Sequence, residues 1–144
     1  MFAPGPADVR AFFVEAGRKR GAGAPLTPLE TIAADWIAAH PEYAADLADA
    51  ERARAAVYPA EAGRENPFLH LSMHLSISEQ VSIDQPAGIR QAFELLAARL
   101  GSAHAAQHEV MECLGRMLWD AQRSSRPPDG AAYIDCVRRR ATLR

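Results

Sequence analysis

The sequence lacks the features of a membrane-spanning or exported chain. No apolar run approaches the roughly 18 residues that a membrane-spanning helix requires. The N-terminal stretch MFAPGPADVRAFF has no basic region followed by an apolar segment, so no signal peptide is predicted. These two absences favour a cytoplasmic location and no membrane partner.

An excess of basic residues is also missing. The chain has 16 Lys and Arg against 18 Asp and Glu, a net charge of -2, which is not typical of a general nucleic-acid binder. Four arginines (Arg138, Arg139, Arg140 and Arg144) do gather near the C-terminus. We interpret them as a solvated helix end whose cations complement the helix dipole. Contact with RNA or an acidic partner is the alternative.

Cysteine is scarce, with only Cys113 and Cys136 and no CxxC spacing. A single disulfide can form between them, but we expect free thiols in a reducing cytosol.

Several catalytic motifs are absent. There is no HExxH zinc-protease helix, because His108-Glu109 is followed by Glu112 where the second His would stand. The sequence also has no Glu-x-x-His pair of the kind found in di-iron bundles, no phosphate-binding glycine loop and no nucleophile elbow. No catalytic residue is therefore assigned, and whether the protein is an enzyme stays open.

What is present predicts an all-α fold. At 144 residues the chain is expected to be a single helical domain, residues 1–144, built as a bundle of about six helices. Thr27-Pro28-Leu29-Glu30 is a capping box, Asn66-Pro67 repeats the start signal, and Gly101 is typical of a helix end. No strand-like alternation occurs. The expected helices cover about 8–20, 27–40, 66–83, 86–100, 102–123 and 129–140, and the Ala-rich, acidic segment 42–56 is expected to be helical too.

Four of the five histidines form two His-x3-His pairs, His70 with His74 and His104 with His108. At 100° per residue, the first pair shares a helical stripe with Ile77, so both imidazoles are predicted to face the core. Burying two neighbouring imidazoles without partners is costly, and this favours a bound ion.

The second pair extends to His-x3-His-x3-Glu and borders an apolar stripe of Met111, Leu114, Leu118 and Ala121. His104 and Glu112 are about 12 Å apart along a helix, so one ion cannot readily take both. It can take His104 with His108, or His108 with Glu112.

Two hypotheses follow. In the first, the pairs lie on facing helices and bind one divalent metal through His70, His74 and His108, with Glu112, His104 or His40 as further ligands. Imidazole with an optional carboxylate suits zinc, iron, copper or nickel, and a set that contains a carboxylate also suits non-haem iron or manganese. Glu112 is the candidate base if the metal activates water. In the second, the protein is a small helical interaction or adaptor protein without catalytic activity. Hydrogen bonds then satisfy its histidines, and the acidic 42–51 segment or the basic tail meets a partner. Neither hypothesis indicates a substrate, a cofactor beyond the metal, or an oligomeric state.

Three segments carry a resemblance to a known family: NPFLHLSMHLSISEQVSIDQPAGIR, HEVMECLGRMLWDAQR and RPPDGAAY. Together with HPEY at 40–43, they resemble the domain of unknown function 1841 family. Its members are short, uncharacterised bacterial proteins, mostly proteobacterial, so the resemblance implies a bacterial source. It implies no activity and supplies no site residues.

Overall fold

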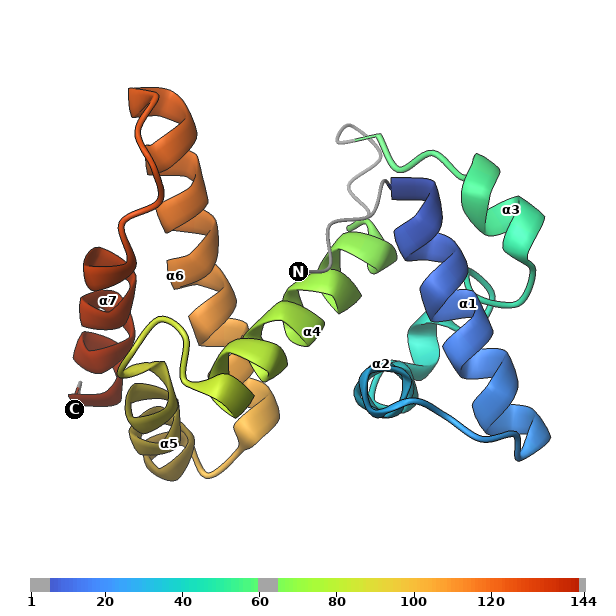
Figure 1. Cartoon of the computed structure of the whole chain (residues 1–144), viewed down its shortest axis with the longest axis horizontal. Helices are drawn as coiled ribbons and strands as arrows, with labels where there is room; N and C mark the ends of the chain where they lie inside the picture. Colours follow the sequence, from blue (N-terminus) through green and yellow to red (C-terminus); the bar gives the residue numbers. More distant parts are fainter. Residues whose placement is uncertain (1–5, 60–64, 143–144) are drawn as a thin grey trace. The chain divides into compact units, whose positions relative to one another are not determined.

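The protein is built from helices, as the sequence predicts. The computed structural model describes residues 6–59 and 65–142, and no strand occurs within those two ranges. The described helices are α1 (Pro6–Ala22), α2 (Pro28–Ala38), the 3-10 helix η1 (Pro41–Tyr43), α3 (Ala50–Ala55), α4 (Pro67–Ile83), α5 (Ile89–Leu100), α6 (Ala103–Ser124) and α7 (Gly130–Thr142) (Figure 1). The all-α fold class is confirmed.

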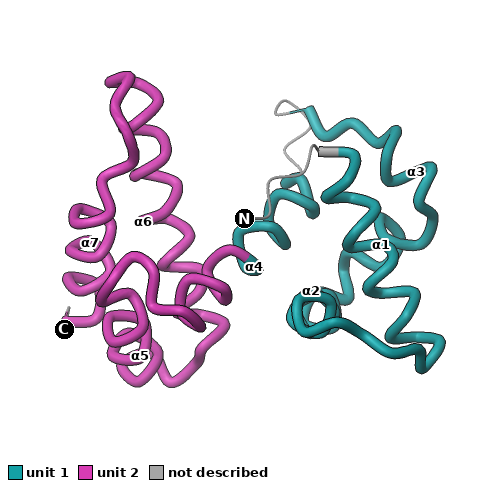
Figure 2. The backbone as a smooth tube through the Cα atoms, in the orientation of Figure 1, with its two compact units in different colours: residues 1–75 teal, residues 76–144 magenta. Residues whose placement is uncertain are grey.

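The chain divides into two compact units, Met1–Leu75 and Ser76–Arg144, and the boundary falls inside α4 (Figure 2). Each unit has its own packed helices. The prediction that residues 1–144 form a single domain stays a prediction.

The first unit is organised around α1, which packs against α2 and α3. Phe13 of α1 and Leu71 of α4 lie fully buried in its apolar core. Arg10 ties the edge of this core to α3 and the segment after it, because its Nη1 donates to the carbonyls of Ala53 and Ala56 at 2.7 Å each. Phe68 of α4 belongs to the same buried core, and the Arg10 guanidinium carbon lies 5.2 Å from its ring centroid.

The start of α2 confirms the predicted capping box. The Glu30 amide donates to the Thr27 hydroxyl at 3.1 Å, and the Thr27 amide donates to the Glu30 carboxylate at 2.9 Å. Lys19 of α1 donates to the same carboxylate at 2.9 Å. The hydrogen bond from Lys19, assisted by the one from Thr27, holds the pKa of Glu30 below its usual value. Ionised Glu30 thus stabilises both the helix start and its contact with α1.

Glu30→Gln tests this linkage between charge and fold. The folded-state pKa is depressed, so the carboxylate stabilises the protein above its unfolded pKa of about 4.3, and this contribution is lost as the pH falls through the folded pKa. We expect the variant to melt at a lower temperature than the wild type at pH 7 and the difference to shrink below about pH 4. Glu42→Gln, at an exposed position of η1, is the charge-matched control. A melting difference that stays constant from pH 7 to pH 3 would contradict the assignment.

In the second unit α5 packs against α6 and α7, and α6 packs against α7. Two hydrogen bonds join the C-terminal half of α4 to this group. The side-chain amide of Gln107 donates to the Ser78 hydroxyl at 3.1 Å, and the Tyr133 hydroxyl donates to the side-chain oxygen of Gln80 at 2.6 Å. Burial raises the pKa of Tyr133, so its hydroxyl stays protonated as a donor.

Helix ends in the second unit follow the predicted signals. Gly101 adopts the left-handed conformation at φ 69° that ends α5, and Ser102 caps α6 by accepting from the Ala105 amide at 3.0 Å. Asp129 accepts from the Ala132 amide at 3.0 Å at the start of α7. The start of α5 differs from the prediction, since the helix begins at Ile89 and was expected from about Pro86.

Two predictions about local structure are wrong. The segment 42–56 is not one helix, because the chain forms only η1 and then, after turns, the six-residue α3. Asp49 restarts the helix there by accepting from the Glu51 amide at 2.8 Å. Leu118 does not continue the buried stripe of α6, since it is 49% exposed.

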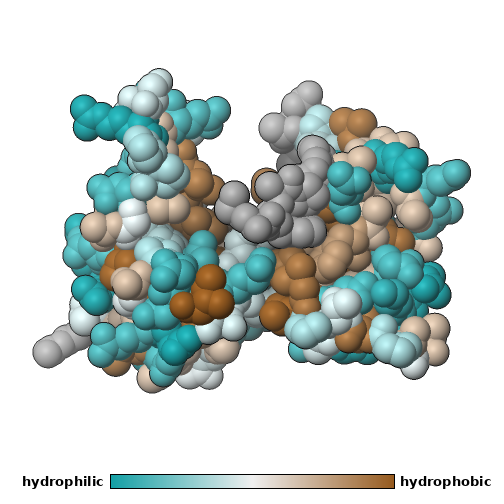
Figure 3. All heavy atoms as spheres, viewed as in Figure 1, coloured by the Kyte–Doolittle hydropathy of each residue, from teal (hydrophilic) through white to brown (hydrophobic). Residues whose placement is uncertain are grey.

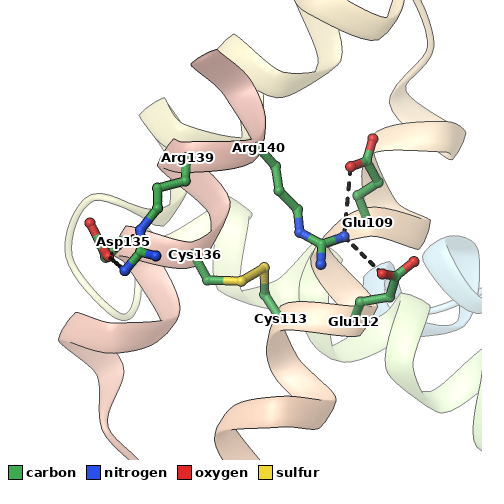
Figure 4. The surroundings of a disulfide bond; sticks show 7 residues. All are labelled: Glu109, Glu112, Cys113, Asp135, Cys136, Arg139 and Arg140. Atoms are coloured by element: carbon green, nitrogen blue, oxygen red, sulfur yellow. Dashed lines mark hydrogen bonds and ion pairs between the residues drawn. A yellow bond between two sulfur atoms is a disulfide. The ribbon is translucent and has the colours of Figure 1, made fainter. Parts of the chain in front are cut away.

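The cysteines also differ from the expectation. Cys113 and Cys136 form a disulfide that joins α6 to α7 (Figure 4), so the prediction of free thiols is wrong. The cytoplasmic location stays a prediction.

One face of the molecule shows how polar and apolar residues are distributed. Hydrophilic residues cover much of the face of each unit drawn in Figure 3, with smaller hydrophobic areas between them. The described helices include none that is both long and apolar enough to cross a membrane.

Candidate metal centre

Helix α4 carries the first histidine pair near its start. Asn66 caps this helix, since its side-chain oxygen accepts from the amides of Phe68 and Leu69 at 3.0 and 3.3 Å. His70 and His74 follow one turn apart, and both are buried, with 9% and 0% exposure. The prediction that this pair faces inward is confirmed.

The two imidazoles of this pair approach one another closely. Their Nε2 atoms lie 3.1 Å apart. Two nitrogens bound to one tetrahedral zinc at 2.0–2.1 Å stand about 3.3 Å apart, so the observed separation is close to that of two ligands on one ion. Without an ion, the same distance fits a hydrogen bond from one ring to the other.

Glu65 fixes the orientation of His70. The His70 Nδ1 lies 2.7 Å from a carboxylate oxygen of Glu65, a group that only accepts when ionised. A neutral His70 therefore donates from Nδ1 and presents its lone pair at Nε2, the atom that faces His74. A carboxylate behind an imidazole is the usual support of a metal-bound histidine.

His40 joins the pair from another segment of the first unit. It is 3% exposed, and its ring centroid lies 4.9 Å from those of both His70 and His74. A ring nitrogen of His40 lies within 4.8 Å of one of His74. Its Nδ1 lies 2.7 Å from the carbonyl oxygen of Trp36, so a neutral His40 carries its proton on Nδ1 and its lone pair on Nε2.

Two aromatic side chains hold these rings in place. Trp36 stacks on His74, with centroids 3.8 Å apart and planes at 12°, and Tyr43 stacks on His40 at 5.2 Å and 3°. Flat stacking restricts rotation of each imidazole about its side-chain bonds. The first unit therefore contains three buried, oriented imidazoles: His40, His70 and His74.

The second pair lies on the first turns of α6, in the second unit. His104 and His108 have ring centroids 4.5 Å apart, and a nitrogen of one lies within 4.8 Å of a nitrogen of the other. His104 is half-buried and His108 is exposed. The i,i+4 spacing thus brings these imidazoles together as predicted, in a more exposed setting than the first pair.

Glu112 is engaged by a cation. Arg140 of α7 donates to its carboxylate at 2.8 Å and lies 3.7 Å from Glu109 (Figure 4). The Glu112 side chain is 66% exposed. Its predicted roles as ligand and base stay predictions. The hypothesis that both histidine pairs share one ion joins residues of the two units and also stays a prediction.

Sequence reasoning found all five histidines but missed Glu65, Trp36 and Tyr43. A signal existed for Trp36, since Trp36-x3-His40 places an aromatic ring and an imidazole on the same helical face. For Glu65, which precedes α4, and for Tyr43, only the folded chain reveals the contact.

The fold and the clustered imidazoles define a small all-α protein with a candidate metal centre. The sequence profile of the domain of unknown function 1841 family matches residues 6–139, and the chain belongs to that family. No curated protein and no solved structure matches it.

The tautomer of His40 can be measured directly. In the neutral form of His40 in metal-free protein, we expect the proton on Nδ1 and the lone pair on Nε2, because the Trp36 carbonyl can only accept. Long-range proton–nitrogen correlation spectra of imidazole-labelled protein report both nitrogens. A His40 proton on Nε2 would contradict the geometry.

Proposed function

We propose that the chain binds a divalent transition metal through its histidine pairs, with His70 and His74 as the anchoring ligands and His40 as the third. The observation that carries the proposal is the 3.1 Å separation of the His70 and His74 Nε2 atoms in a buried site. A pair of close, oriented ring nitrogens is what a divalent ion requires of its ligands.

The chemistry of the donors narrows the choice of metal. His40 and His70 each use Nδ1 to donate a hydrogen bond, so both keep Nε2 for coordination. Three imidazoles and a water make a catalytic-type zinc site, in which the metal can lower the pKa of the water. Nitrogen donors favour zinc or iron, and manganese would need an additional carboxylate. No substrate follows from this donor set.

The proposal has a fuller form, in which His104 and His108 add ligands to the same ion. Glu112 would then be a carboxylate ligand or the base, after release from Arg140. This form rests on the i,i+4 convergence of the second pair. It predicts that losing either pair empties the site.

A second candidate function is that of an interaction protein without chemistry. The hydrogen-bonded series Glu65–His70–His74 supports it, because an imidazole pair satisfied in this way needs no ion. The two candidates differ in whether the histidines bind metal or only pack.

Metal content is the first measurement. We expect about one zinc, iron or manganese per chain in untagged protein purified without chelator, measured by plasma mass spectrometry. His70→Ala should lose it. Leu69→Ala, an exposed neighbour on the same helix, is the matched control and should keep it. Failure to bind stoichiometric metal even after reloading would exclude the proposal and leave the interaction protein.

The variant His108→Ala separates the two forms of the metal proposal. Loss of the ion would support a site shared by both pairs. Retention, combined with loss in His40→Ala, would assign the ion to His40, His70 and His74 alone.

Thermal stability gives an independent test that uses His74→Ala. A ligand that binds only the folded state stabilises it by about 2.7 kcal/mol at a free concentration 100 times its Kd. We expect added zinc to raise the melting temperature of the chelated wild type and to leave that of His74→Ala unchanged. Equal losses of stability for this variant with and without metal would mean that His74 only packs.

A further inference from the structure

The second unit contains a cavity that the metal proposal does not use. It has a volume of about 400 Å³, enough for a small molecule, and lies between α6 and α7. Both cysteines of the disulfide line it, as do three arginines and one acidic residue. These charged residues are Arg116, Asp120, Arg139 and Arg140.

The arginines follow the cysteines at helical spacing. Arg116 comes three residues after Cys113, and Arg140 comes four residues after Cys136, so each guanidinium shares a helical face with a sulfur. Arg140 is paired with Glu109 and Glu112, as Figure 4 shows. Arg139 is paired with Asp135. Arg116 is exposed and lines the cavity, and no ion pair to it occurs among the described residues.

We propose that this cavity is a thiol–disulfide exchange site that takes a small, negatively charged thiol. Arg139 and Arg140 already pair with carboxylates, so the Arg116 guanidinium supplies the attraction for the acidic groups of the thiol. The disulfide in the cavity wall is the reacting group. Guanidinium beside sulfur also stabilises a thiolate, which makes the departing cysteine a better leaving group.

The exchange has two balanced steps. The thiolate of the small molecule attacks Sγ of Cys136, which is half-buried, whereas Cys113 is only 1% exposed. The protein S–S bond breaks, a mixed disulfide forms at Cys136, and the electron pair leaves on the thiolate of Cys113. A second small thiolate attacks the mixed disulfide, which releases Cys136 as a thiolate and the small thiol as its own disulfide. Two electrons pass to the protein, and solvent supplies the protons.

The second unit can remain folded through this reaction. Tyr133, Ile134 and Val137 bury α7 in the unit independently of the sulfur bridge. The hydrogen bond from Tyr133 to Gln80 is also unaffected by reduction. Exchange is therefore a reaction of the folded protein.

The test measures the reduction rate with three thiols of different charge: glutathione (negative), 2-mercaptoethanol (neutral) and cysteamine (positive). Each rate is expressed per thiolate and divided by that thiol's rate with a small uncharged disulfide. At low salt we expect the normalised rate to be highest for glutathione, lower for 2-mercaptoethanol and lowest for cysteamine. The differences should shrink as salt screens the charges. Equal normalised rates, or the reverse order, would overturn the proposal.

Arg116→Gln and Arg126→Gln each remove one positive charge. Arg116 lines the cavity and Arg126 does not, so Arg126→Gln is the control. We expect Arg116→Gln to slow glutathione about fivefold and to leave 2-mercaptoethanol unchanged, and Arg126→Gln to change neither. Equal slowing by both variants would mean that only net charge matters and would overturn the site.

Urea distinguishes exchange in the folded state from exchange through unfolding. A reaction at the cavity should proceed at a nearly constant rate at low urea, whereas a route through global unfolding accelerates steeply with urea. Steep acceleration from the lowest concentrations would show that the disulfide is only structural.

Discussion

The arrangement of the first unit depends on one requirement, which is that every nitrogen of a buried imidazole must have a partner. His70 lies at the centre of this requirement, with Glu65 on one ring nitrogen and His74 on the other. At the end of α2, the Trp36 carbonyl holds the Nδ1 of His40, whose ring centroid lies 4.9 Å from those of His70 and His74. The polar centre and the apolar core around Phe13 and Leu71 therefore stabilise the same packing of helices.

Local signals predicted the helix ends well because they act within a few residues. Thr27, Ser102 and Asp129 each cap a helix by accepting from the amide three residues ahead, which requires no distant contact. The prediction of one helix over 42–56 was wrong because that helix would have depended on packing against the rest of the chain. Its alanines favour a helix, but it has few large apolar side chains, and a short helix is marginal without packing. The chain there forms turns until Asp49 supplies a new cap.

The candidate site shows the same division between local and distant contacts. The i,i+4 spacing alone predicted that His70 meets His74 and that His104 meets His108, because neighbouring turns of one helix lie side by side. The partners from elsewhere could not be predicted, since nothing in the sequence orders Tyr43 or Glu65 against those rings. The disulfide is a further case. Whether Cys113 and Cys136 meet depends on how α6 packs on α7, and 23 residues of separation leave this open.

That sulfur bridge also gives the second unit a property that its packing alone would not. The connection between α6 and α7, residues 125–129, consists mainly of exposed residues. Exposed connections of this kind are where proteases cut most readily. A chain cut there would still migrate as one species under non-reducing electrophoresis, because Cys113 and Cys136 lie on opposite sides of the cut. The loop is therefore dispensable for covalent continuity, and the ends of α6 and α7 stay tethered after the backbone between them is broken.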